Sequence, residues 1–454
     1  MARLAWFSPM PPARTGIAAA SVVAVAALRR THEIDVYAHG GAHDFLWRHQ
    51  RRPYDLTVYQ LGNSSSHDFM WPYLFRHPGL AVLHDAHLHH SRAAALLREQ
   101  RTGAYRDEFA ANHPDVSPEA AELAVKGFDS FLYYLWPMTR LVVDASRLTA
   151  VHARLSVEAL RKASPRAALD TIRLGHGERL SAERIAVARR RVRTRYGIPD
   201  TNILFAVCGG LTPEKRLPQV LKAFAALLPY EPDVHLLLAG APAGHYDLAA
   251  DVERLGLSAA VSITGYLEDE EAFTDAMAAC DVSLNLRWPT AREVSGPWLR
   301  ALAAGKPTVT LDLAHTADVP SLDPRTWTIA HAGVSPDATP EPVTVAVDLL
   351  DEDHSLRLAM RRLAADADLR ADLGRAASAH WETWHSTDGM IADYERVIAR
   401  ALEAPVPAAD LPAHLRADGS ARLRALLAPF GSAVVRLAHG RPSLGMGADL
   451  WDTI

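Results

Sequence analysis

Short apolar runs alternate with amphipathic stretches along most of this 454-residue chain. In the first half, we expect strands at residues 4–7, 34–37, 56–61, 80–84, 148–152 and 171–174. In the second half, the corresponding runs lie at residues 202–207, 234–239, 261–264, 282–286, 308–311 and 326–330. A strand buried on both faces reads as a continuous apolar run, and the stretches between such runs supply covering helices. The pattern therefore predicts an α/β protein with two Rossmann-like domains, each built on a parallel sheet.

Two longer stretches are expected to be mostly helical, residues 91–166 and residues 341–380. The first carries a cluster of aromatic residues at helical spacing, namely Phe128, Phe131, Tyr133, Tyr134 and Trp136. Such a cluster forms part of a core or, alternatively, a partly exposed apolar wall beside a binding site. A final helix is expected from Trp381 to Leu402, and a Pro- and Ala-rich linker follows it.

The composition is that of an ordinary globular protein, with 49% hydrophobic and 22% charged residues. The net charge of −5 gives no indication of a nucleic-acid partner. Cys208 and Cys280 are its two cysteines, so neither a disulfide framework nor a zinc motif is expected, and a reducing compartment fits. Prolines precede the apolar run 17–28, which argues against a signal peptide, and no run reaches the ~20 residues of a membrane span. We therefore expect a cytoplasmic protein without a transmembrane segment.

The chain opens with a strand, a glycine-containing turn and a helix, as a Rossmann-type unit does. The turn ends at Gly16, and the helix is expected to begin near Ile17. The three-glycine dinucleotide fingerprint is absent, so NAD is not expected. From the residues alone, this turn is either an ordinary strand-to-helix loop or part of a ligand site.

Histidines gather at positions 84, 87, 89 and 90, where an expected strand ends, with Asp85 among them. A metal site is one interpretation, but no acidic or Cys ligand pattern repeats elsewhere, and we predict no metal ligand. We favour a solvated helix start for the last three histidines. His84 differs because it ends its strand at the carboxyl edge of the sheet, where open α/β folds bind ligands.

Residues 285–311 combine a strand end, a polar loop, a helix and a second strand. Ser295 is a good N-cap, and Pro297 suits the first turn of the helix, which is expected to end at Gly305. Glu293 lies in the loop beside the helix N-terminus, where N–H groups and the dipole favour an anion such as a phosphate. Its carboxylate therefore either contacts a sugar hydroxyl or caps the helix.

A second candidate turn follows the expected strand 202–207. It reads C-G-G-L-T-P-E-K-R from Cys208 to Arg216 and leads into a helix with one apolar face. Lys215 would lie in the first turn of that helix, where the dipole slightly disfavours a cation. This misfit favours anion binding by Lys215 over the alternative of a solvated lysine.

These motifs, in this order, resemble the signature of glycosyltransferase family 4, a retaining family with the GT-B fold. The resemblance is close in P-W-L-R-A-L-A-A-G-K-P at residues 297–307, and residues 209–215 resemble the family's Gly-Arg-Leu…Glu-Lys motif. The resemblance implies two Rossmann-like domains whose parallel sheets face a central cleft. It implies no cofactor, with a nucleotide-diphosphate sugar as co-substrate.

The resemblance also implies roles for individual residues. Glu293 and His84 would be the catalytic residues beside the donor sugar. The donor-binding residues would be Gly16, Arg14, Gly209, Gly210, Lys215, Arg216, Tyr266, Ser295, Gly296 and Arg300. The chain departs from the family's pattern at Gly210, where an Arg is usual, and at Arg300, where an acid usually contacts the ribose. Glu293 itself is one position late, with Arg292 in the usual place.

With this resemblance, the sequence predicts a glycosyltransferase that moves a sugar from a nucleotide-sugar donor to an acceptor hydroxyl, with retention and without a metal. The acceptor is left open as a carbohydrate, a lipid-linked or a small molecule. The alternatives are a nucleotide-sugar epimerase or phosphorylase on the same fold, or a catalytically degenerate sugar-nucleotide-binding module. The expected domains are residues 1–177 for the acceptor, rejoined by helix 381–404, residues 178–380 for the donor, and a tail of unknown role at 405–454.

Overall fold

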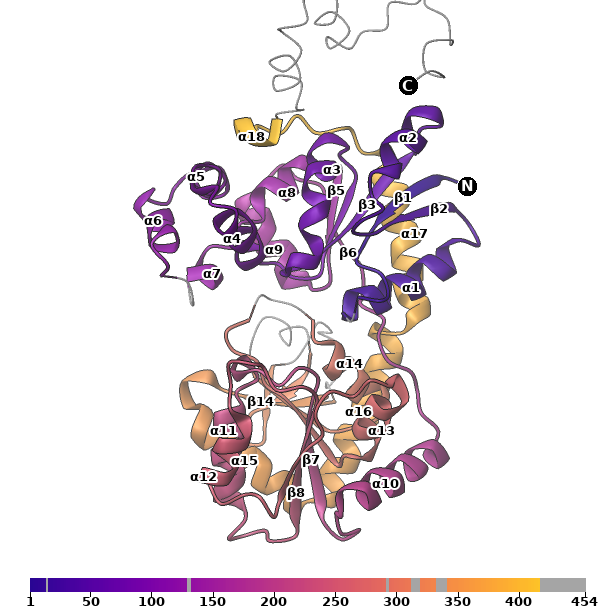
Figure 1. Ribbon diagram of the computed structural model, residues 1–454. Coiled ribbons are helices and arrows are strands. Elements are labelled where there is room, and N and C mark those ends of the chain that lie inside the picture. Colours follow the sequence, from indigo (N-terminus) through magenta and orange to yellow (C-terminus); the bar gives the residue numbers. More distant parts are fainter. Residues whose placement is uncertain (14, 129–131, 291–293, 312–318, 332–340, 417–454) are drawn as a thin grey trace, which may run out of the picture. The chain divides into compact units, whose positions relative to one another are not determined.

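The computed structural model describes residues 1–13, 15–128, 132–290, 294–311, 319–331 and 341–416. Residues 1–408 form one compact unit. Residues 409–454 form a second, whose described helix is α18 (Ala413–Arg416). The first unit contains two parallel-sheet α/β halves, as the hydrophobic pattern predicts (Figure 1).

The first half is built on a parallel sheet in which six strands of the described chain lie in the order β2-β1-β3-β4-β5-β6. The strands are β1 (Arg3–Phe7), β2 (Glu33–Tyr37), β3 (Leu56–Leu61), β4 (Leu80–Leu83), β5 (Leu148–Val151) and β6 (Leu169–Thr171). The helices are α1 (Gly16–Leu28), α2 (Asp44–Arg51), the 3₁₀ turn η1 (Ser65–Met70), α3 (Trp71–Arg76), α4 (His89–Arg98), α5 (Thr102–Asn112), α6 (Glu119–Val125), α7 (Leu132–Leu135), α8 (Arg140–Ala145) and α9 (Arg154–Ala163). This order sets the carboxyl ends of β1, β3 and β4 side by side, where a ligand site is expected.

The second half carries a sheet whose order, over the strands in the described ranges, is β13-β12-β14-β11-β10-β7-β8-β9. Its pairings are parallel except that of β12 with β13. The strands are β7 (Ile203–Cys208), β8 (Val234–Ala239), β9 (Val261–Ile263), β10 (Val282–Asn285), β11 (Thr308–Leu311), β12 (Ser321–Leu322), β13 (Ile329–His331) and β14 (Thr344–Val347). The helices are α10 (Ala182–Tyr196), η2 (Pro213–Lys215), α11 (Leu217–Leu227), α12 (Leu248–Arg254), α13 (Glu270–Ala279), α14 (Gly296–Ala303), η3 (Leu349–Asp351), α15 (Glu352–Ala365) and α16 (Ala367–Trp384). Because β7 and β10 are neighbours, the loops that follow them lie together.

The last long helix, α17 (Thr387–Glu403), returns to the first sheet. Its apolar face joins the core that contains Leu4 and Trp6 of β1, and it contacts β3, β5 and β6 (Figure 1). Asp393 on this helix accepts hydrogen bonds from Arg173, just after β6. The helix expected from Trp381 is thus two helices, because α16 ends at Trp384 and Ser386 caps the start of α17.

The main error of the sequence-based assignment is at β14, which lies inside a stretch expected to be helical. Thr344–Val347 is a fully buried strand between β11 and β12. A four-residue apolar run carries too little periodicity to separate a strand from a helix, and the helices α15 and α16 after it dominate the pattern. Two other expected strands are shifted: that at 171–174 lies at β6, and that at 326–330 lies at β13.

Candidate active site

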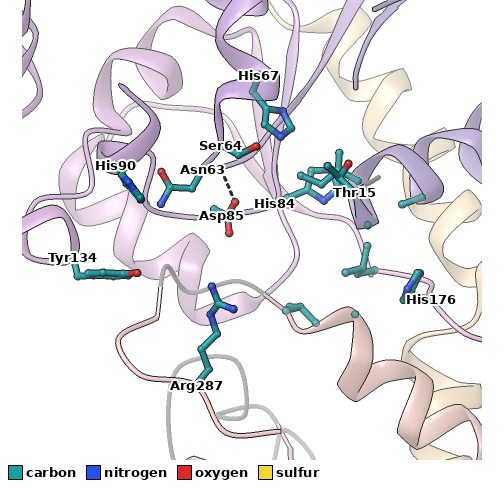
Figure 2. A pocket seen from close by; sticks show the side chains of 16 residues that line it. Thr15, Asn63, Ser64, His67, His84, Asp85, His90, Tyr134, His176 and Arg287 are labelled. Carbon is teal, nitrogen blue, oxygen red and sulfur yellow. Dashed lines mark hydrogen bonds between the residues drawn. The ribbon is translucent and has the colours of Figure 1, made fainter. Parts of the chain in front are cut away.

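A cavity of about 330 Å³ lies at the carboxyl ends of strands from both sheets (Figure 2). Its described lining residues are Thr15, Gly16, Ile17, Ala20, Asn63, Ser64, His67, His84, Asp85, His90, Tyr134, Leu174, His176, Arg287, Val294 and Gly296. Three residues predicted from the sequence, Gly16, His84 and Gly296, therefore line one cavity. Its position is the one at which open α/β sheets bind ligands.

His84 follows β4 and is held by two neighbours. Its Nε2 lies 2.8 Å from the side-chain amide of Gln60, and its Nδ1 lies 3.1 Å from Nε2 of His152. Burial lowers the pKa of His84 well below its usual value, and His152 adds to the effect. His84 is thus a neutral ring with both nitrogens engaged. The predicted contact to a sugar hydroxyl would require His84 to exchange one of these partners.

The hydrogen bonds that join Gln60, His84, His152 and the carbonyl of Ile172 all have the same donor-to-acceptor direction. His152 Nδ1 lies 2.8 Å from the carbonyl of Ile172, to which it must donate. A neutral His152 then accepts at Nε2 from His84 Nδ1, which leaves His84 Nε2 as an acceptor. The amide nitrogen of Gln60 is buried without a partner, and a half-turn of this amide brings it to His84 Nε2. With Gln60 as donor, both histidines are satisfied as neutral rings.

Asp85 places a carboxylate in the same wall of the cavity. Its Oδ2 accepts a hydrogen bond of 2.6 Å from the backbone N–H of Asn63, which follows β3. Asn63 is fixed in turn, because its Oδ1 accepts from the N–H of Ser91 at 3.0 Å. Asp85 is therefore a positioned hydrogen-bond acceptor at the carboxyl edge of the first sheet.

Lys215 lies in the turn η2, before α11, and not in the first turn of that helix as expected. Its ammonium donates to the carbonyl of Cys208, and burial lowers its pKa to about 8. A Cβ at Gly209 would lie 2.9 Å from Lys215 Nζ and 3.2 Å from Cγ of Pro297. Gly209, at φ +98°, is thus required for the close approach of the lysine to the first turn of α14.

The two residues beside Gly209 and Lys215 differ in their surroundings. Arg216 forms a bidentate ion pair with the buried carboxylate of Glu352, at the start of α15. Gly210 has no heavy atom within 4 Å of an added Cβ. Neither is among the described residues that line the cavity, and their donor contacts stay predictions. A phosphate bound to Arg216 would have to compete with Glu352.

The N-terminus of α14 is built as the sequence predicts. Ser295 is the N-cap and accepts from the N–H of Trp298, and Pro297 lies in the first turn. A Cβ at Gly296 would lie 3.1 Å from the ring of His176, which explains the glycine. Backbone N–H groups of this turn therefore border the cavity and suit an anion.

Arg300, on α14, is held by three groups. Its Nε donates to Nε2 of His176 at 2.9 Å, it pairs with Glu270, and its guanidinium lies 5.0 Å from the ring centre of Phe273. Burial, together with the Arg300 charge, lowers the pKa of His176 to about 4, so His176 accepts as a neutral ring. The predicted ribose contact of Arg300 stays a prediction.

Three further predicted residues remain. Tyr266 follows β9 at the turn of Gly265, with about half of its surface exposed (49%), as a nucleobase platform requires. Arg14 and Glu293 lie outside the described residues. The roles of all three stay predictions.

The histidines after His84 are mostly not solvated. His87 and His89 are buried, and only His90 is exposed, so the expected solvated helix start is wrong for the first two. His89 is 2.8 Å from the hydroxyl of Tyr105 and packs in an aromatic cluster, which the local sequence does not reveal. Over the described ranges, no group of three His, Cys, Asp or Glu side chains is arranged to hold a metal ion.

The half of the chain that contains Lys215 and α14 is similar to a known protein family. Residues 188–319 match the model of the family described as glycosyl transferases group 1. This match covers less than a third of the 454-residue chain, so the similarity is to that segment. The resemblance to glycosyltransferases predicted from the motifs is therefore confirmed, while the assignment to family 4 stays a prediction.

A curated relative of this chain comes from Mycobacterium tuberculosis and is 30% identical over 197 residues. Its name is GDP-mannose-dependent alpha-(1-6)-phosphatidylinositol dimannoside mannosyltransferase. The match covers 41% of this chain and 48% of the relative, so the chain spans about half the length of the relative it matches.

Solved structures resemble the chain over most of its length. Anabaena Alr3699/HepE in complex with UDP and glucose has a TM-score of 0.60 at 16% identity, covering 88% of this chain and 100% of that one. Sucrose-phosphate synthase from Thermosynechococcus elongatus has a TM-score of 0.60 at 14% identity, covering 89% and 100%. At these identities the likeness shows the fold alone, and it confirms the predicted GT-B fold. Of the helices that the structure describes, none has the length and apolar character to cross a membrane.

Several lining residues were not predicted as site residues. Asn63 and Arg287 come shortly after β3 and β10, so the rule that ligands lie at carboxyl ends of parallel strands could have found them. Asp85 adjoins a predicted residue. Tyr134 belongs to the aromatic cluster for which a wall beside a binding site was one of the two interpretations, and it lines the cavity. His176 reaches the cavity from outside the strand ends, and no local signal indicates this.

Proposed function

We propose that this chain is a glycosyltransferase that transfers a sugar from a nucleotide-diphosphate sugar to an acceptor hydroxyl. The observation that carries the proposal is the cavity shared by the strand ends of both sheets, with the N-terminal turn of α14 at its border. This turn lies inside the segment that matches the glycosyl transferases group 1 model. A nucleotide sugar places its diphosphate at such a turn and its sugar in the cavity.

The turn suits the departing diphosphate. Charge develops on this group as the glycosidic bond breaks, so fixed positive charge stabilises the transition state. Lys215 lies at Gly209 beside the first turn of α14, whose N–H groups point to the same region. Because these groups neutralise the diphosphate, the scheme needs no divalent metal.

The transfer proceeds with retention of configuration. The bond between the anomeric carbon and the diphosphate oxygen breaks, and the acceptor oxygen attacks the same face of the sugar. The acceptor proton passes to the departing phosphate. Asp85 would orient the acceptor hydroxyl, and His84 and Glu293 would contact the donor sugar.

The names of the similar proteins support two donors for testing. The mycobacterial relative is named as GDP-mannose-dependent, and Alr3699/HepE was solved with UDP and glucose and with UDP-glucose. The relative's acceptor is a phosphatidylinositol dimannoside by name, which adds lipid-linked acceptors to free carbohydrates and small molecules. We propose a cytoplasmic enzyme whose acceptor is a lipid-linked molecule, a free carbohydrate or a small molecule.

A binding screen followed by a transfer assay tests the proposal. UDP, GDP and ADP are first compared by thermal shift, and the sugar of the stabilising nucleotide is then incubated with hydroxylated acceptors. Formation of a glycoside together with free nucleotide is the expected result. Conversion of the donor without an acceptor would identify an epimerase. A requirement for inorganic phosphate would identify a phosphorylase, and nucleotide binding without turnover would identify a binding module.

A further inference from the structure

Arg287 brings a positive charge into the cavity from the second sheet. It follows β10, and among the described lining residues it is the one arginine, with no lysine beside it. Figure 2 shows its side chain extending from the loop into the cavity. The sequence motifs did not indicate this residue, and the function proposed above does not use it.

The backbone holds Arg287 next to the Lys215 turn. The N–H of Trp288 donates to the carbonyl of Glu214 at 2.7 Å. This hydrogen bond joins the residue after Arg287 to the residue before Lys215. Burial is the main cause of the lowered pKa of Lys215, and the Arg287 charge contributes to it, which places the two cations within electrostatic reach. Cations held this close repel each other, and a dianion between them removes that cost.

The other arginines of the region, Arg216 and Arg300, are not among the described residues that line the cavity. Arg216 is paired with the buried Glu352, and Arg300 with Glu270 and His176. Burial raises the pKa of Glu214, but hydrogen bonds in its own turn and the Arg287 charge lower it below the usual value, so Arg287 also has a carboxylate within electrostatic reach. Unlike Arg216 and Arg300, Arg287 lines the cavity itself, and a guanidinium can hold two phosphate oxygens at once.

We propose that Arg287 binds the donor diphosphate together with Lys215. The proposal rests on the use of a nucleotide sugar, as inferred above. The second cationic contact to the diphosphate thus comes from the loop after β10. Gly210, where the family resemblance led us to expect an arginine, leaves that part of the turn open.

Calorimetric titration of the full chain with UDP and GDP tests this. Arg287→Ala should weaken binding of the nucleotide that the wild type prefers by roughly 10- to 100-fold, as expected for a lost charge-assisted hydrogen bond. Arg287→Lys should retain part of the affinity. Arg254→Ala, which removes an exposed arginine on α12, is the matched control and should bind as the wild type does. Unchanged melting temperatures show that each variant is folded.

Two further arms separate the phosphate from other contacts. Saturation-transfer NMR measures the binding of the nucleosides uridine and guanosine, which lack the phosphates. Their affinity should be the same in Arg287→Ala and in the wild type. Gly210→Arg in the Arg287→Ala background should return part of the lost affinity, since Gly210 has space for a side chain and lies outside the left-handed region of φ.

The outcomes distinguish the two proposals. A wild-type chain that binds no nucleoside diphosphate overturns the proposed function. A wild-type chain that binds one, with Arg287→Ala equal to it, overturns only the role of Arg287. An equal loss for nucleoside and nucleoside diphosphate also overturns that role. The double variant Arg216→Gln, Glu352→Gln gives a further check. If it loses affinity for the nucleoside diphosphate while Arg287→Ala keeps it, the phosphate contact belongs to Arg216.

Discussion

The two walls of the cavity use different chemistry. The wall from the first sheet is a network of neutral or acidic groups, in which His84 is held between Gln60 and His152, and Asp85 by Asn63. The wall from the second sheet carries Arg287 and borders a turn with Lys215 and the N-terminus of a helix. One wall offers hydrogen-bond acceptors, and the other offers positive charge.

This difference fits a reaction with an anionic leaving group and a neutral nucleophile. In the proposed reaction, the departing diphosphate would lie at the cationic wall, where charge is stabilised, and the acceptor hydroxyl would lie beside the carboxylate. Burial keeps His84 and its partner His152 uncharged, with the pKa of His152 lowered to about 4. A cation there would attract the diphosphate to the wrong wall, so the neutral histidines preserve the asymmetry.

The largest expected effect comes from the cationic wall. Lys215→Ala removes a buried ammonium and should lower kcat/KM for the donor roughly 100-fold, the upper range for a charge-assisted hydrogen bond. Lys222→Ala, which removes an exposed lysine of α11, should leave kcat/KM within about 2-fold. Steady-state kinetics with the preferred donor measure both, and equal kinetics in the two variants would remove Lys215 from the site.

The acidic wall should affect the acceptor and spare the nucleotide. Asp85→Asn keeps the shape of the side chain and removes its charge, so the acceptor KM should rise roughly 10-fold while nucleotide affinity changes little. Asp115→Asn, at an exposed position in the same half, is the control. If nucleotide affinity falls while the acceptor KM is unchanged, the two walls have been assigned the wrong way round.

Gln60→Glu tests whether His84 must be neutral. A carboxylate accepts from His84 Nε2 where the amide donates, so the His84–His152 pair takes up a proton and its pKa rises. The wild-type rate should not depend on His84 between pH 6 and pH 8, roughly, since its pKa lies below this window. The rate of the variant should fall as the pH drops through the raised pKa, by roughly 3- to 10-fold near pH 6.

Gln60→Met removes the hydrogen bond without adding a charge and should show no new inflection in its pH–rate profile. His67, whose buried ring also lies near His84, has a pKa lowered to about 4 and is silent in this window. A flat profile for Gln60→Glu would show that the charge of His84 does not influence transfer.

The smallest expected effect is that of chelation. If Lys215, Arg287 and the N–H groups of α14 neutralise the diphosphate, a metal-stripped preparation in EDTA should keep its rate within about 2-fold. Loss of activity that manganese or magnesium restores would show that the cationic wall is insufficient.

The strands, the turn after β7 and the start of α14 could be predicted because their signals are local. β3, β8 and β11 lie where the apolar runs place them, and Ser295 caps α14 as its sequence indicates. Gly209 and Lys215 lie together because a glycine-containing turn follows a buried strand.

The remaining features depend on tertiary packing. His89 is buried because Tyr105 on α5 covers it, and β14 is a strand because β11 and β12 pair with it. Nothing near Gln60 in the sequence indicates that it contacts His84. The pairing of Arg216 with Glu352 joins residues 136 positions apart, so the sequence could not show that this cation is engaged.

Sugar transfer from a nucleotide sugar is tested most directly by ¹H NMR of the reaction. The chain is incubated with GDP-mannose or UDP-glucose and with octyl glycosides as acceptor probes, and the anomeric signals are followed over time. We predict a new glycosidic signal with the donor's anomeric configuration, appearing at the rate at which free nucleoside diphosphate appears. A glycoside of inverted configuration would contradict the proposed retention. A donor that binds and is never consumed with any acceptor would contradict sugar transfer by this chain.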